Sequence, residues 1–361
     1  MHVKHIQCVA CGRIYGRNQI VFLCECGGSL DVAYDYSEIK KKVTWHKLRK
    51  RPFNHWRYRE FFPVYRDHNI ISLGEGGTPL LNLKNNIYLK LESLNLTGSF
   101  KDRGSTVEVS KALEFGVKKI GCASTGNMGA SVAAYCARAG IKAKIFLPSI
   151  ALKTKIRQIQ VHGAETVVVK GTYTKAEETA KKQKGLYLMG DYPYRGEGEK
   201  SVAYEIMDEI NADYIICPVG NATLISAVWK GLKELKICGL ISKLPKLVAV
   251  QSSGCSPLVD AFNSGKEISE VYPKTIATAI ACGYPIDGRK ALKALNESNG
   301  IAVKVSDAEI LNARRELAHS GIDAEPSGAV SYAGLRKLKL PKNKIKACII
   351  SGHGLKDLEN I

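Results

Sequence analysis

The sequence predicts an α/β protein built from two doubly wound parallel sheets, preceded by a small N-terminal module with paired cysteines. Beyond about residue 70, short β-branched runs alternate with amphipathic stretches, which is the rhythm of βαβ units. Small polar residues fill several strand-to-helix junctions, where ligands bind in open α/β sheets. Four cysteines fall in two pairs within the first thirty residues.

The alternation of runs predicts the main elements in order. Strands are expected at 118–124, 143–148, 166–171, 213–220 and 246–253. Helices are expected between them at 131–140, 174–183 and 225–235. Strands separated by helices of this length pair in parallel, so helices should cover both faces of the sheets.

Composition excludes several classes of protein. The 361 residues are 45% hydrophobic and 24% charged, as in globular chains, and no apolar run is long enough to span a bilayer. The start lacks a signal-peptide core, so a cytoplasmic protein without a membrane partner is expected. The net charge of +19 is spread along the chain and aromatic residues make up only 7%, which argues against a nucleic-acid partner.

Two cysteine pairs near the N-terminus have the pattern of a structural zinc ribbon. The four thiols are Cys8, Cys11, Cys24 and Cys26. The glycines after each pair, Gly12 and Gly27, allow backbone amides to turn toward the sulfurs. Four protein ligands would leave no open position on a metal, so we expect a structural role, with a metal-free remnant as the alternative. The other seven of the 11 cysteines are scattered, as small buried hydrophobes are.

Lys101 is the candidate nucleophile. It follows Leu94–Gly98, where a strand-like piece is expected to end, and it lies in Ser99–Asp102, which is expected to open a helix. A helix N-terminus disfavours a cation and therefore favours the neutral amine, the form that attacks a carbonyl. An ordinary surface lysine is the alternative when this segment is considered alone.

The segment 122–131 offers a cradle for a carboxylate. Ser124, Thr125 and the amides that follow them would lie at a helix N-terminus, which attracts anions. Asn127 can donate from its side-chain amide to a phenolate-like oxygen. A capped helix start without a ligand remains the alternative.

Two later segments complete the candidate site. The first is a phosphate-binding loop formed by Gly220, Asn221, Ala222, Thr223 and Leu224, ahead of a helix. Neither a P-loop nor a dinucleotide-binding glycine motif is present, which argues against ATP and NAD. In the second, an apolar strand should end at Ser351, whose hydroxyl could bond to a pyridine nitrogen.

The order of these motifs is more specific than any one of them. The chain contains LGEGGTPL (73–80), LTGSFKDRG (96–104), ASTGNMGAS (123–131), PYRGEGEKS (193–201), PVGNATLISAVWKG (218–231), TIATAI (275–280), EPSGA (325–329) and SGHGLKD (351–357). From the cysteine module to the C-terminus, this series resembles threonine synthases, of the tryptophan synthase β-type class (fold type II) of pyridoxal-phosphate (PLP) enzymes.

The resemblance implies a role for each motif. Lys101 matches the lysine that carries PLP as a Schiff base, Asn127 the partner of the 3′ oxygen of PLP, and Ser351 the hydroxyl that faces its ring nitrogen. The loop 220–224 matches the one that binds the cofactor phosphate. The implied substrate contacts are Ser99, Ser124, Thr125, Met128 and Arg195. Arg195 matches an arginine that grips the substrate phosphate.

A division into three parts also follows from the resemblance. Residues 1–35 would form the zinc-ribbon-like module, 36–106 with 212–361 the large PLP-binding domain, and 107–211 a smaller mobile domain. The implied reaction converts O-phosphohomoserine and water into L-threonine and phosphate. Lys101 would then act as the general base, and a homodimer is common in this class.

The chain departs from the family pattern near the substrate. Gly190, Asp191 and Tyr192 stand where the family has Ser, any residue and Asn, so a hydroxyl donor to the substrate phosphate is missing and an anion is added. Met128 stands where Thr is usual. Losing one charge-assisted hydrogen bond costs about 1.5–3 kcal/mol, enough to alter the choice of substrate.

The cofactor loop departs as well, because Thr223 and Leu224 replace a Gly-Asn pair, although backbone amides remain available there. These departures keep two alternatives open. One is a β-replacement enzyme acting on O-phosphoserine, similar to cysteate or cysteine synthases. The other is a threonine or serine dehydratase, which SFKDRG together with SGHGLKD favours less.

Overall fold

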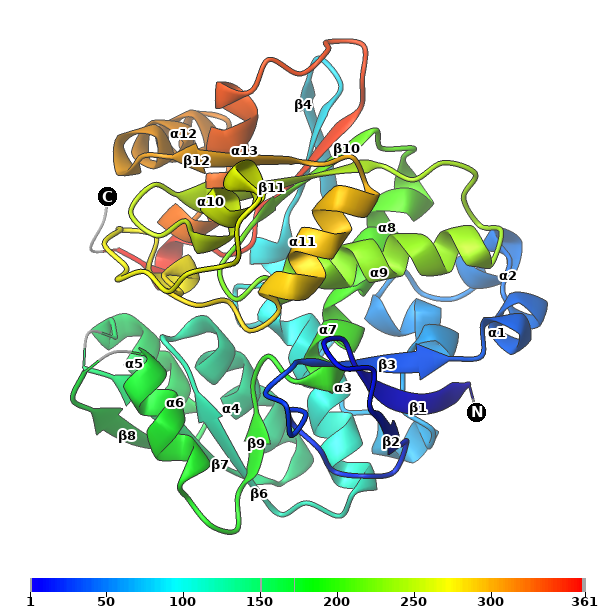
Figure 1. The fold of residues 1–361 in the computed structure, drawn as a ribbon, viewed down its shortest axis with the longest axis vertical. Coiled ribbons are helices and arrows are strands. Elements are labelled where there is room, and N and C mark those ends of the chain that lie inside the picture. Colours follow the sequence, from blue (N-terminus) through cyan, green and yellow to red (C-terminus); the bar gives the residue numbers. More distant parts are fainter. Residues whose placement is uncertain (1, 150, 172, 359–361) are drawn as a thin grey trace.

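The computed structural model describes residues 2–149, 151–171 and 173–358 of the chain (Figure 1). They form three sheets, of six, four and three strands. Figure 1 shows the six-stranded sheet in the upper half, the four-stranded sheet at the lower left and the N-terminal strands at the lower right. Within the described ranges no helix is both long and apolar enough to cross a membrane.

The six-stranded sheet has the order β12-β11-β10-β13-β5-β4. Its strands are β4 (Leu80–Lys84), β5 (Ile87–Lys90), β10 (Tyr214–Pro218), β11 (Lys246–Ser252), β12 (Ile301–Val305) and β13 (Lys346–Ile349). Every neighbouring pair is parallel except β4 with β5, which is antiparallel. The sequence predicts a wholly parallel sheet, so this edge differs from the prediction. A two-residue link between β4 and β5 allows only a hairpin, and this makes β4 an antiparallel edge.

Helices cover both faces of this sheet. Helix α13 (Pro326–Lys337) packs on strands β10 to β13, and α9 (Thr223–Ile237), α10 (Pro257–Ser264) and α11 (Gly288–Glu297) contact β10, β11 or β12. Helix α12 (Asp307–His319) packs on α13, and α8 (Ser201–Glu209) on α9. Burial from both sides explains the continuous apolar run of β10, in which Ile215, Ile216 and Cys217 are fully buried.

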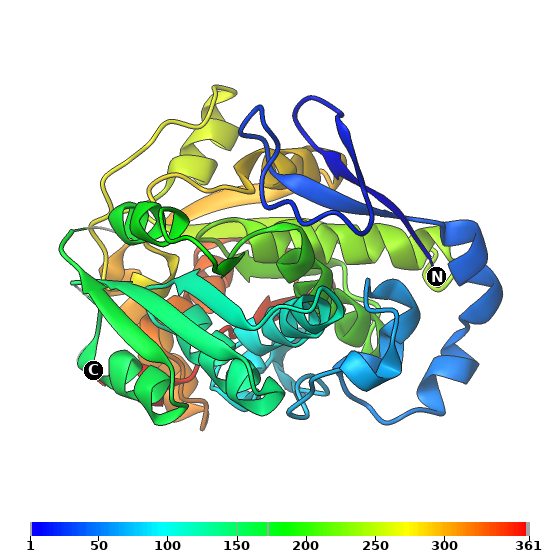
Figure 2. The same ribbon diagram turned by 90° about the horizontal axis from the view of Figure 1, so that it is seen from below.

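The four-stranded sheet is parallel throughout, in the order β8-β7-β6-β9. Its strands are β6 (Lys119–Ala123), β7 (Lys142–Pro148), β8 (Glu165–Val169) and β9 (Tyr187–Met189). Helices α4 (Asn127–Ala139) and α5 (Lys153–Val161) lie on one face and α6 (Tyr173–Lys181) on the other, as Figures 1 and 2 show together. The chain reverses its direction across the sheet at α6, and right-handed crossovers then place α6 opposite α4 and α5.

The N-terminal sheet is antiparallel and consists of β1 (Val3–Cys8), β2 (Ile14–Gly16) and β3 (Leu30–Tyr34). Helices α1 (Tyr36–Lys42) and α2 (Trp45–Arg49) follow it. The module packs on the body of the protein, because its buried residues share one hydrophobic core with α8, α9 and α11. Polar contacts support this packing: Tyr34 donates to Glu197 at 2.6 Å, and Lys230 bonds to Asp31 and to the carbonyl oxygen of Val32.

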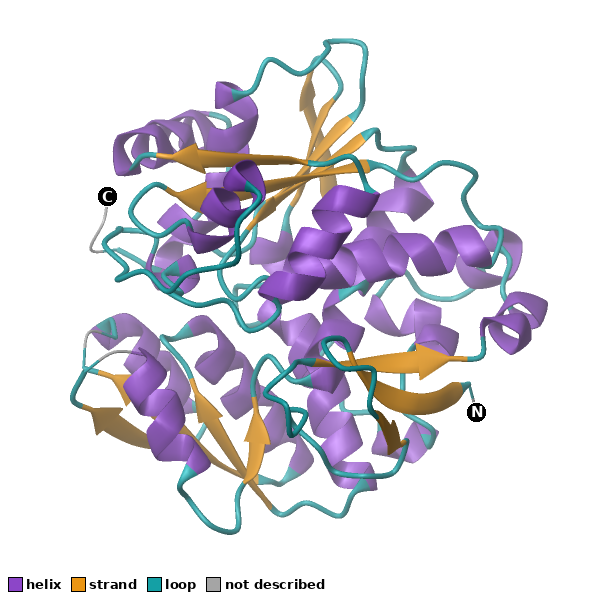
Figure 3. Ribbon diagram, viewed as in Figure 1, coloured by secondary structure: helices purple, strands orange, loops and turns teal. Residues whose placement is uncertain are grey.

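Two further helices, α3 (Lys101–Glu114) and α7 (Pro193–Glu199), pack closely against each other (Figure 3). The expected strands and helices are confirmed, with shifts at the functional junctions. The strand before Lys101 ends at Lys90 and a 3-10 turn (Glu92–Leu94) follows, whereas the sequence predicts an end at residues 94–98. Helix α9 begins at Thr223, so the end of the expected loop forms its first turn. The three-part domain division stays a prediction.

Candidate active site

Lys101 is the first residue of α3. The turn before it is held by distant parts of the chain, because the amide of Phe100 donates to the carbonyl oxygen of Ser351 at 3.1 Å. The amide and hydroxyl of Thr97 donate to the carboxylate of Asp102, at 2.8 and 2.6 Å. Lys101 and Ser351, 250 positions apart in the sequence, are therefore neighbours. The Lys101 side chain is 17% exposed.

Two buried carboxylates face the Lys101 amine. Lys101 Nζ donates to Glu199 Oε1 at 3.4 Å, and Asp191 Oδ1 lies 3.9 Å away. Burial raises the pKa of Glu199 to about 7, against the opposing charges of Lys101 and Arg195. Burial also acts to raise the pKa of Asp191, but the charges of Lys101 and Arg195 outweigh it, and the pKa is lowered. Glu199 was not among the residues expected at the site, although it lies within the motif PYRGEGEKS.

Arg195, expected to grip the substrate phosphate, is fully buried and forms an ion pair with Glu108 of α3. Its remaining donors bond to the carbonyl oxygens of Gly190 and Lys101 and to the Ser105 hydroxyl, at 3.2–3.4 Å. The guanidinium is therefore held by the protein, not turned toward open space. Burial raises the pKa of Glu108 to about 7 in spite of this arginine.

Asn127 begins α4, and its side-chain amide donates to Glu325 Oε1 at 2.5 Å. Glu325 Oε2 in turn accepts from the buried Lys155 at 3.0 Å. Lys155 lies directly under the loop before Asn127, because a Cβ placed on Gly126 would come within 2.2 Å of its side chain. No motif of the sequence indicates Lys155, and the motif EPSGA contains Glu325 without indicating a role for it.

The expected carboxylate cradle differs in its details. The Ser124 hydroxyl accepts from the amides of Gly126 and Gly129, at 2.9 and 2.8 Å, so it caps the start of α4. Met128 is 6% exposed and packs in the hydrophobic core of the small sheet. In this arrangement the Ser124 hydroxyl is engaged by backbone amides and the Met128 side chain by apolar neighbours. Thr125, by contrast, lines a cavity.

The loop 220–224 ends at the N-terminus of α9. Ala222 has a left-handed backbone (φ 67°), and Gly220 approaches Ile280 so closely that a Cβ would come within 3.0 Å of its backbone. Asn221 donates to Asp191 Oδ2 at 2.5 Å. The backbone amides of the first turn of α9, from Thr223, have no carbonyl partner within the helix, as a phosphate site requires.

A cavity of about 800 Å³ borders the site at Thr125 and Asn221. Its other walls come from the N-terminal module (residues 26–29), from α6 and from the segment 267–289. Lys101 is not among the residues that line it.

Several buried polar atoms of this region have no hydrogen-bond partner in the protein. Those of the described residues near Lys101 are Ser99 Oγ, Asn127 Oδ1, Asp191 Oδ1, Glu199 Oε2 and Thr223 Oγ1. Such atoms are costly unless a ligand or water satisfies them, and three of them belong to residues expected to bind PLP or substrate, namely Ser99, Asn127 and Thr223. Together with Lys101 and the amides at the start of α9, they fit PLP: an amine for its aldehyde and donors for its phosphate, whereas the Asn127 amide would have to leave Glu325 Oε1 to donate to its 3′ oxygen.

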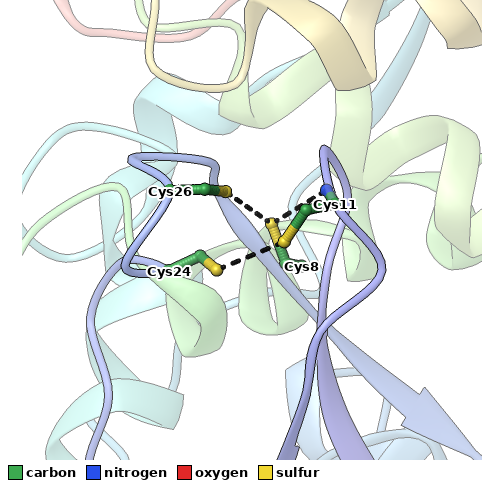
Figure 4. Close-up of side chains that lie close together, drawn as sticks. All are labelled: Cys8, Cys11, Cys24 and Cys26. Atoms are coloured by element: carbon green, nitrogen blue, oxygen red, sulfur yellow. Dashed lines mark hydrogen bonds between the residues drawn. The ribbon is translucent and has the colours of Figure 1, made fainter.

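The four N-terminal thiols converge, as the sequence predicts. Their sulfurs lie within 4.8 Å of one another, and Figure 4 shows them pointing inward from two loops. The closest pairs, Cys8 with Cys26 and Cys11 with Cys24, are 3.6 Å apart. A hydrogen bond from the Tyr15 hydroxyl at 3.1 Å lowers the pKa of Cys24 to about 6. These thiols could hold a metal ion.

Comparison with known proteins agrees with this geometry. The family model described as "Pyridoxal-phosphate dependent enzyme" matches residues 71–352. The chain is 46% identical to the threonine synthase of Methanocaldococcus jannaschii, covering 97% of this chain and 92% of the relative. It is 41% identical to that of Methanosarcina acetivorans (99% and 93% covered) and 40% identical to that of Synechocystis (83% and 82%).

Solved structures share the fold. Maize serine racemase superposes with a TM-score of 0.68 at 22% identity, covering 77% of this chain and 88% of the racemase. A threonine deaminase from Solanum lycopersicum superposes with a TM-score of 0.64 at 24% identity, covering 76% and 79%. With a lysine at the head of α3 amid unsatisfied polar atoms, and with the threonine synthases matching nearly its whole length, the chain belongs to the pyridoxal-phosphate dependent enzymes and, among them, to the threonine synthase family.

Proposed function

We propose that this protein is a PLP-dependent threonine synthase, a lyase that converts O-phosphohomoserine and water into L-threonine and phosphate. One observation carries the proposal: the relatives at 46% and 41% identity, which match 97% and 99% of this chain, are threonine synthases. The ordered motifs and the surroundings of Lys101 support the same activity.

In this proposal each part of the site has a task. Lys101 binds the cofactor, Asn127 faces its 3′ oxygen and Ser351 its ring nitrogen. The phosphate of the cofactor lies on the loop 220–224 at the start of α9. Ser99 and Thr125 contact the substrate, while Ser124 and Met128 shape the loop that receives its carboxylate. Bound PLP supplies an electron sink for charge that develops at the substrate carbons.

Lys101 has the placement of a general base. Its amine projects from a rigid helix start beside Glu199 and Asp191, so it can take and return protons without leaving the site. Arg195 helps to fix the position of Lys101, because it donates to the Lys101 carbonyl oxygen at 3.3 Å. Glu108 holds Arg195 in place through their ion pair. A buried site of this kind excludes bulk water while charge develops.

A β-replacement reaction on O-phosphoserine is the second candidate. The arrangement around Arg195 favours it: the guanidinium is occupied by Glu108, and Gly190 has no side chain to offer a phosphate. A substrate one methylene shorter would place its phosphate elsewhere. This candidate keeps the same assignments for Lys101, Asn127 and Ser351.

A coupled assay distinguishes the two candidates. The PLP-loaded protein is given O-phosphohomoserine while phosphate and threonine are both measured, and in parallel it is given O-phosphoserine with sulfide or sulfite. We expect threonine and phosphate in equal amounts, abolished by Lys101→Ala. An intact cofactor absorbance band with turnover of O-phosphoserine alone would replace the first candidate by the second.

We further propose that Cys8, Cys11, Cys24 and Cys26 hold a structural Zn²⁺. The pairs lie on tight turns, and four thiolates satisfy tetrahedral zinc without an open position. Metal analysis of the purified protein should give one zinc per chain, and Cys11→Ser with Cys24→Ser should remove it. A protein with full thermal stability and no metal would contradict this assignment.

Two broader expectations belong to the same proposal, a homodimeric assembly and a cytoplasmic location. Light scattering on the holoenzyme tests the first and cell fractionation the second. A monomer at working concentration would overturn the first without affecting the activity proposed above.

A further inference from the structure

Glu199 is a buried carboxylate that contacts the Lys101 amine through only one of its two oxygens. It is the last residue of α7 and is fully buried. Glu199 Oε1 accepts from Lys101 Nζ at 3.4 Å, whereas Glu199 Oε2 has no partner in the protein. One oxygen thus contacts the reacting amine while the other remains available to a proton.

The charges around Glu199 come from three elements. Helix α3 contributes Lys101 and Glu108, the turn after β9 contributes Asp191, and Arg195 lies one turn earlier on α7 itself. Two cations therefore face three carboxylates in a buried volume. Such a cluster cannot hold all of its carboxylates ionised at low cost, so at least one of them is prone to bind a proton.

We propose that Glu199 is a further catalytic residue, which exchanges a proton with Lys101 during turnover. After Lys101 Nζ has taken a proton from the substrate, that proton passes along the hydrogen bond to Glu199 Oε1 and later returns. One proton moves in each direction, no bond between heavy atoms changes, and no electrons are transferred. The neutral amine is thereby restored, so Lys101 can act as a base again in the same cycle.

Glu199 is better suited to this task than Asp191. It is closer to Lys101 Nζ, at 3.4 Å against 3.9 Å, and one oxygen of Asp191 is already engaged by the Asn221 amide at 2.5 Å. The pKa directions agree, because the pKa of Glu199 is raised to about 7 while that of Asp191 is lowered. Two neighbouring carboxylates with separated pKa values take different roles, here a proton carrier and a fixed negative charge.

The inference rests on the proposed function only in requiring that Lys101 act as a base. Its test therefore uses a step that comes before the loss of phosphate. The PLP-loaded enzyme is incubated with L-threonine or L-serine in D₂O, and exchange of the α proton for deuterium is followed by NMR. We expect Glu199→Gln to slow the exchange by about 10²-fold or more, the lower range for a lost acid–base group. Glu199→Asp, which keeps the carboxyl group, should restore part of the rate.

A matched control is Glu234→Gln. Glu234 is an equally buried carboxylate that bonds to Lys200 at 2.9 Å and does not touch Lys101. The Glu234→Gln variant should leave the exchange rate within a few-fold of wild type, since this substitution neutralises a buried charge outside the site. A comparable loss in both variants would mean that a general effect of buried charge explains the result, and the inference would fall.

A second readout does not depend on activity. Infrared difference spectra between pH 5 and 9 report protonated carboxyl groups in the protein without cofactor, and subtracting the Glu199→Gln spectrum isolates Glu199. A carboxyl band that titrates near pH 7 and vanishes in the variant is the expected result. A Glu199 that is ionised at every pH in this range, or exchange at the wild-type rate in Glu199→Gln, would overturn the inference.

The two proposals can fail separately. An enzyme that exchanges the α proton in a Glu199-dependent manner, but leaves O-phosphohomoserine intact, would contradict the synthase activity and support the role of Glu199. Threonine synthesis that is unaffected by Glu199→Gln would do the reverse.

Discussion

Two buried clusters of charge start from α3, only two residues apart, and they are built in opposite ways. The Arg103 cluster is saturated. Its guanidinium bonds to Glu92 and Glu205 at 2.6–2.7 Å and to the Ser201 and Thr78 hydroxyls, while Lys90 bonds to Glu205 at 2.7 Å. No buried side-chain atom of Arg103, Lys90 or the two glutamates lacks a partner.

The Lys101 cluster is unsaturated. Asp191 and Glu199 each keep one buried oxygen without a partner, and so does the Thr223 hydroxyl. Complete pairing stabilises a fixed structure, whereas unpaired buried groups cost free energy unless a ligand satisfies them. The difference between the clusters indicates that Arg103 anchors α3 so that Lys101 can be presented to a ligand.

The largest expected effect is on activity, from Lys101→Ala. Removing the amine should lower kcat by at least ~10³-fold, because both cofactor attachment and the base are lost. The free energy of unfolding should change little, since the side chain is partly exposed and its pairs are long. Steady-state kinetics and urea denaturation measure the two quantities. Activity within tenfold of wild type would remove Lys101 from the mechanism.

Arg103→Met should show the reverse pattern, with stability as the main loss. It leaves the buried Glu92 without its cation and leaves Glu205 with Lys90 alone, which costs about 3–5 kcal/mol of unfolding free energy. The control is Arg49→Met, because Arg49 is 56% exposed and its partner Asp208 also pairs with Arg57. That variant should lose less than about 1 kcal/mol. Equal losses in urea denaturation would show that the Arg103 cluster is not the anchor.

The two clusters should respond to pH in opposite directions. The pKa of Glu199 is raised from its ordinary 4.5 to about 7, so its contribution to stability is present below 4.5 and is lost as the pH rises through 7. Glu199→Gln should therefore be more stable than wild type at pH 8, by on the order of 1–3 kcal/mol, and equal to it near pH 4.

For Glu205 the sign is reversed. Burial acts to raise its pKa, but Arg103 and Lys90 outweigh it and the pKa is lowered, so its contribution is present above 4.5 and is lost as the pH falls below that value. Glu205→Gln should be less stable than wild type at pH 8, and the gap should narrow in acid. Denaturation curves of both variants between pH 4 and 8 test this. If the stability difference from wild type changed with pH in the same direction for both variants, the distinction between the clusters would be lost.

The smallest effect is expected from Thr223→Val. Its buried hydroxyl has no hydrogen bond of standard geometry and lies near the Asp191 carboxylate, so without cofactor the variant should lose less than about 1 kcal/mol of unfolding free energy. Affinity for PLP should fall about tenfold, the value of one hydrogen bond to a charged group. Ser226→Ala on the same helix is the control, because that hydroxyl bonds to the carbonyl oxygen of Ala222. Absorbance titration with PLP gives both affinities, and equal values would argue against a phosphate at Thr223.

Much of this molecule was predictable from short stretches of sequence. The strands at 119–123 and 214–218 follow from β-branched runs, and the four thiols from two cysteine pairs on turns. Lys101 was indicated by the ordered series of motifs along the chain, whereas the turn before it is held by Ser351, 250 positions away. The antiparallel edge β4 was missed, since a strand pattern does not state the direction of its partner.

The sequence by itself determined the fold class and the cysteine cluster, because each depends on residues close together in the chain. It indicated Lys101 only through motifs spread over most of the chain, and the role of this lysine stays a prediction. Only the tertiary structure decided that Arg195 pairs with Glu108, that Met128 lies in the core and that Glu199 faces Lys101. The two pairs join residues about 90 to 100 positions apart, and packing chooses among many possible partners. Burial and neighbouring charges then set each pKa, and neither is fixed until the helices meet.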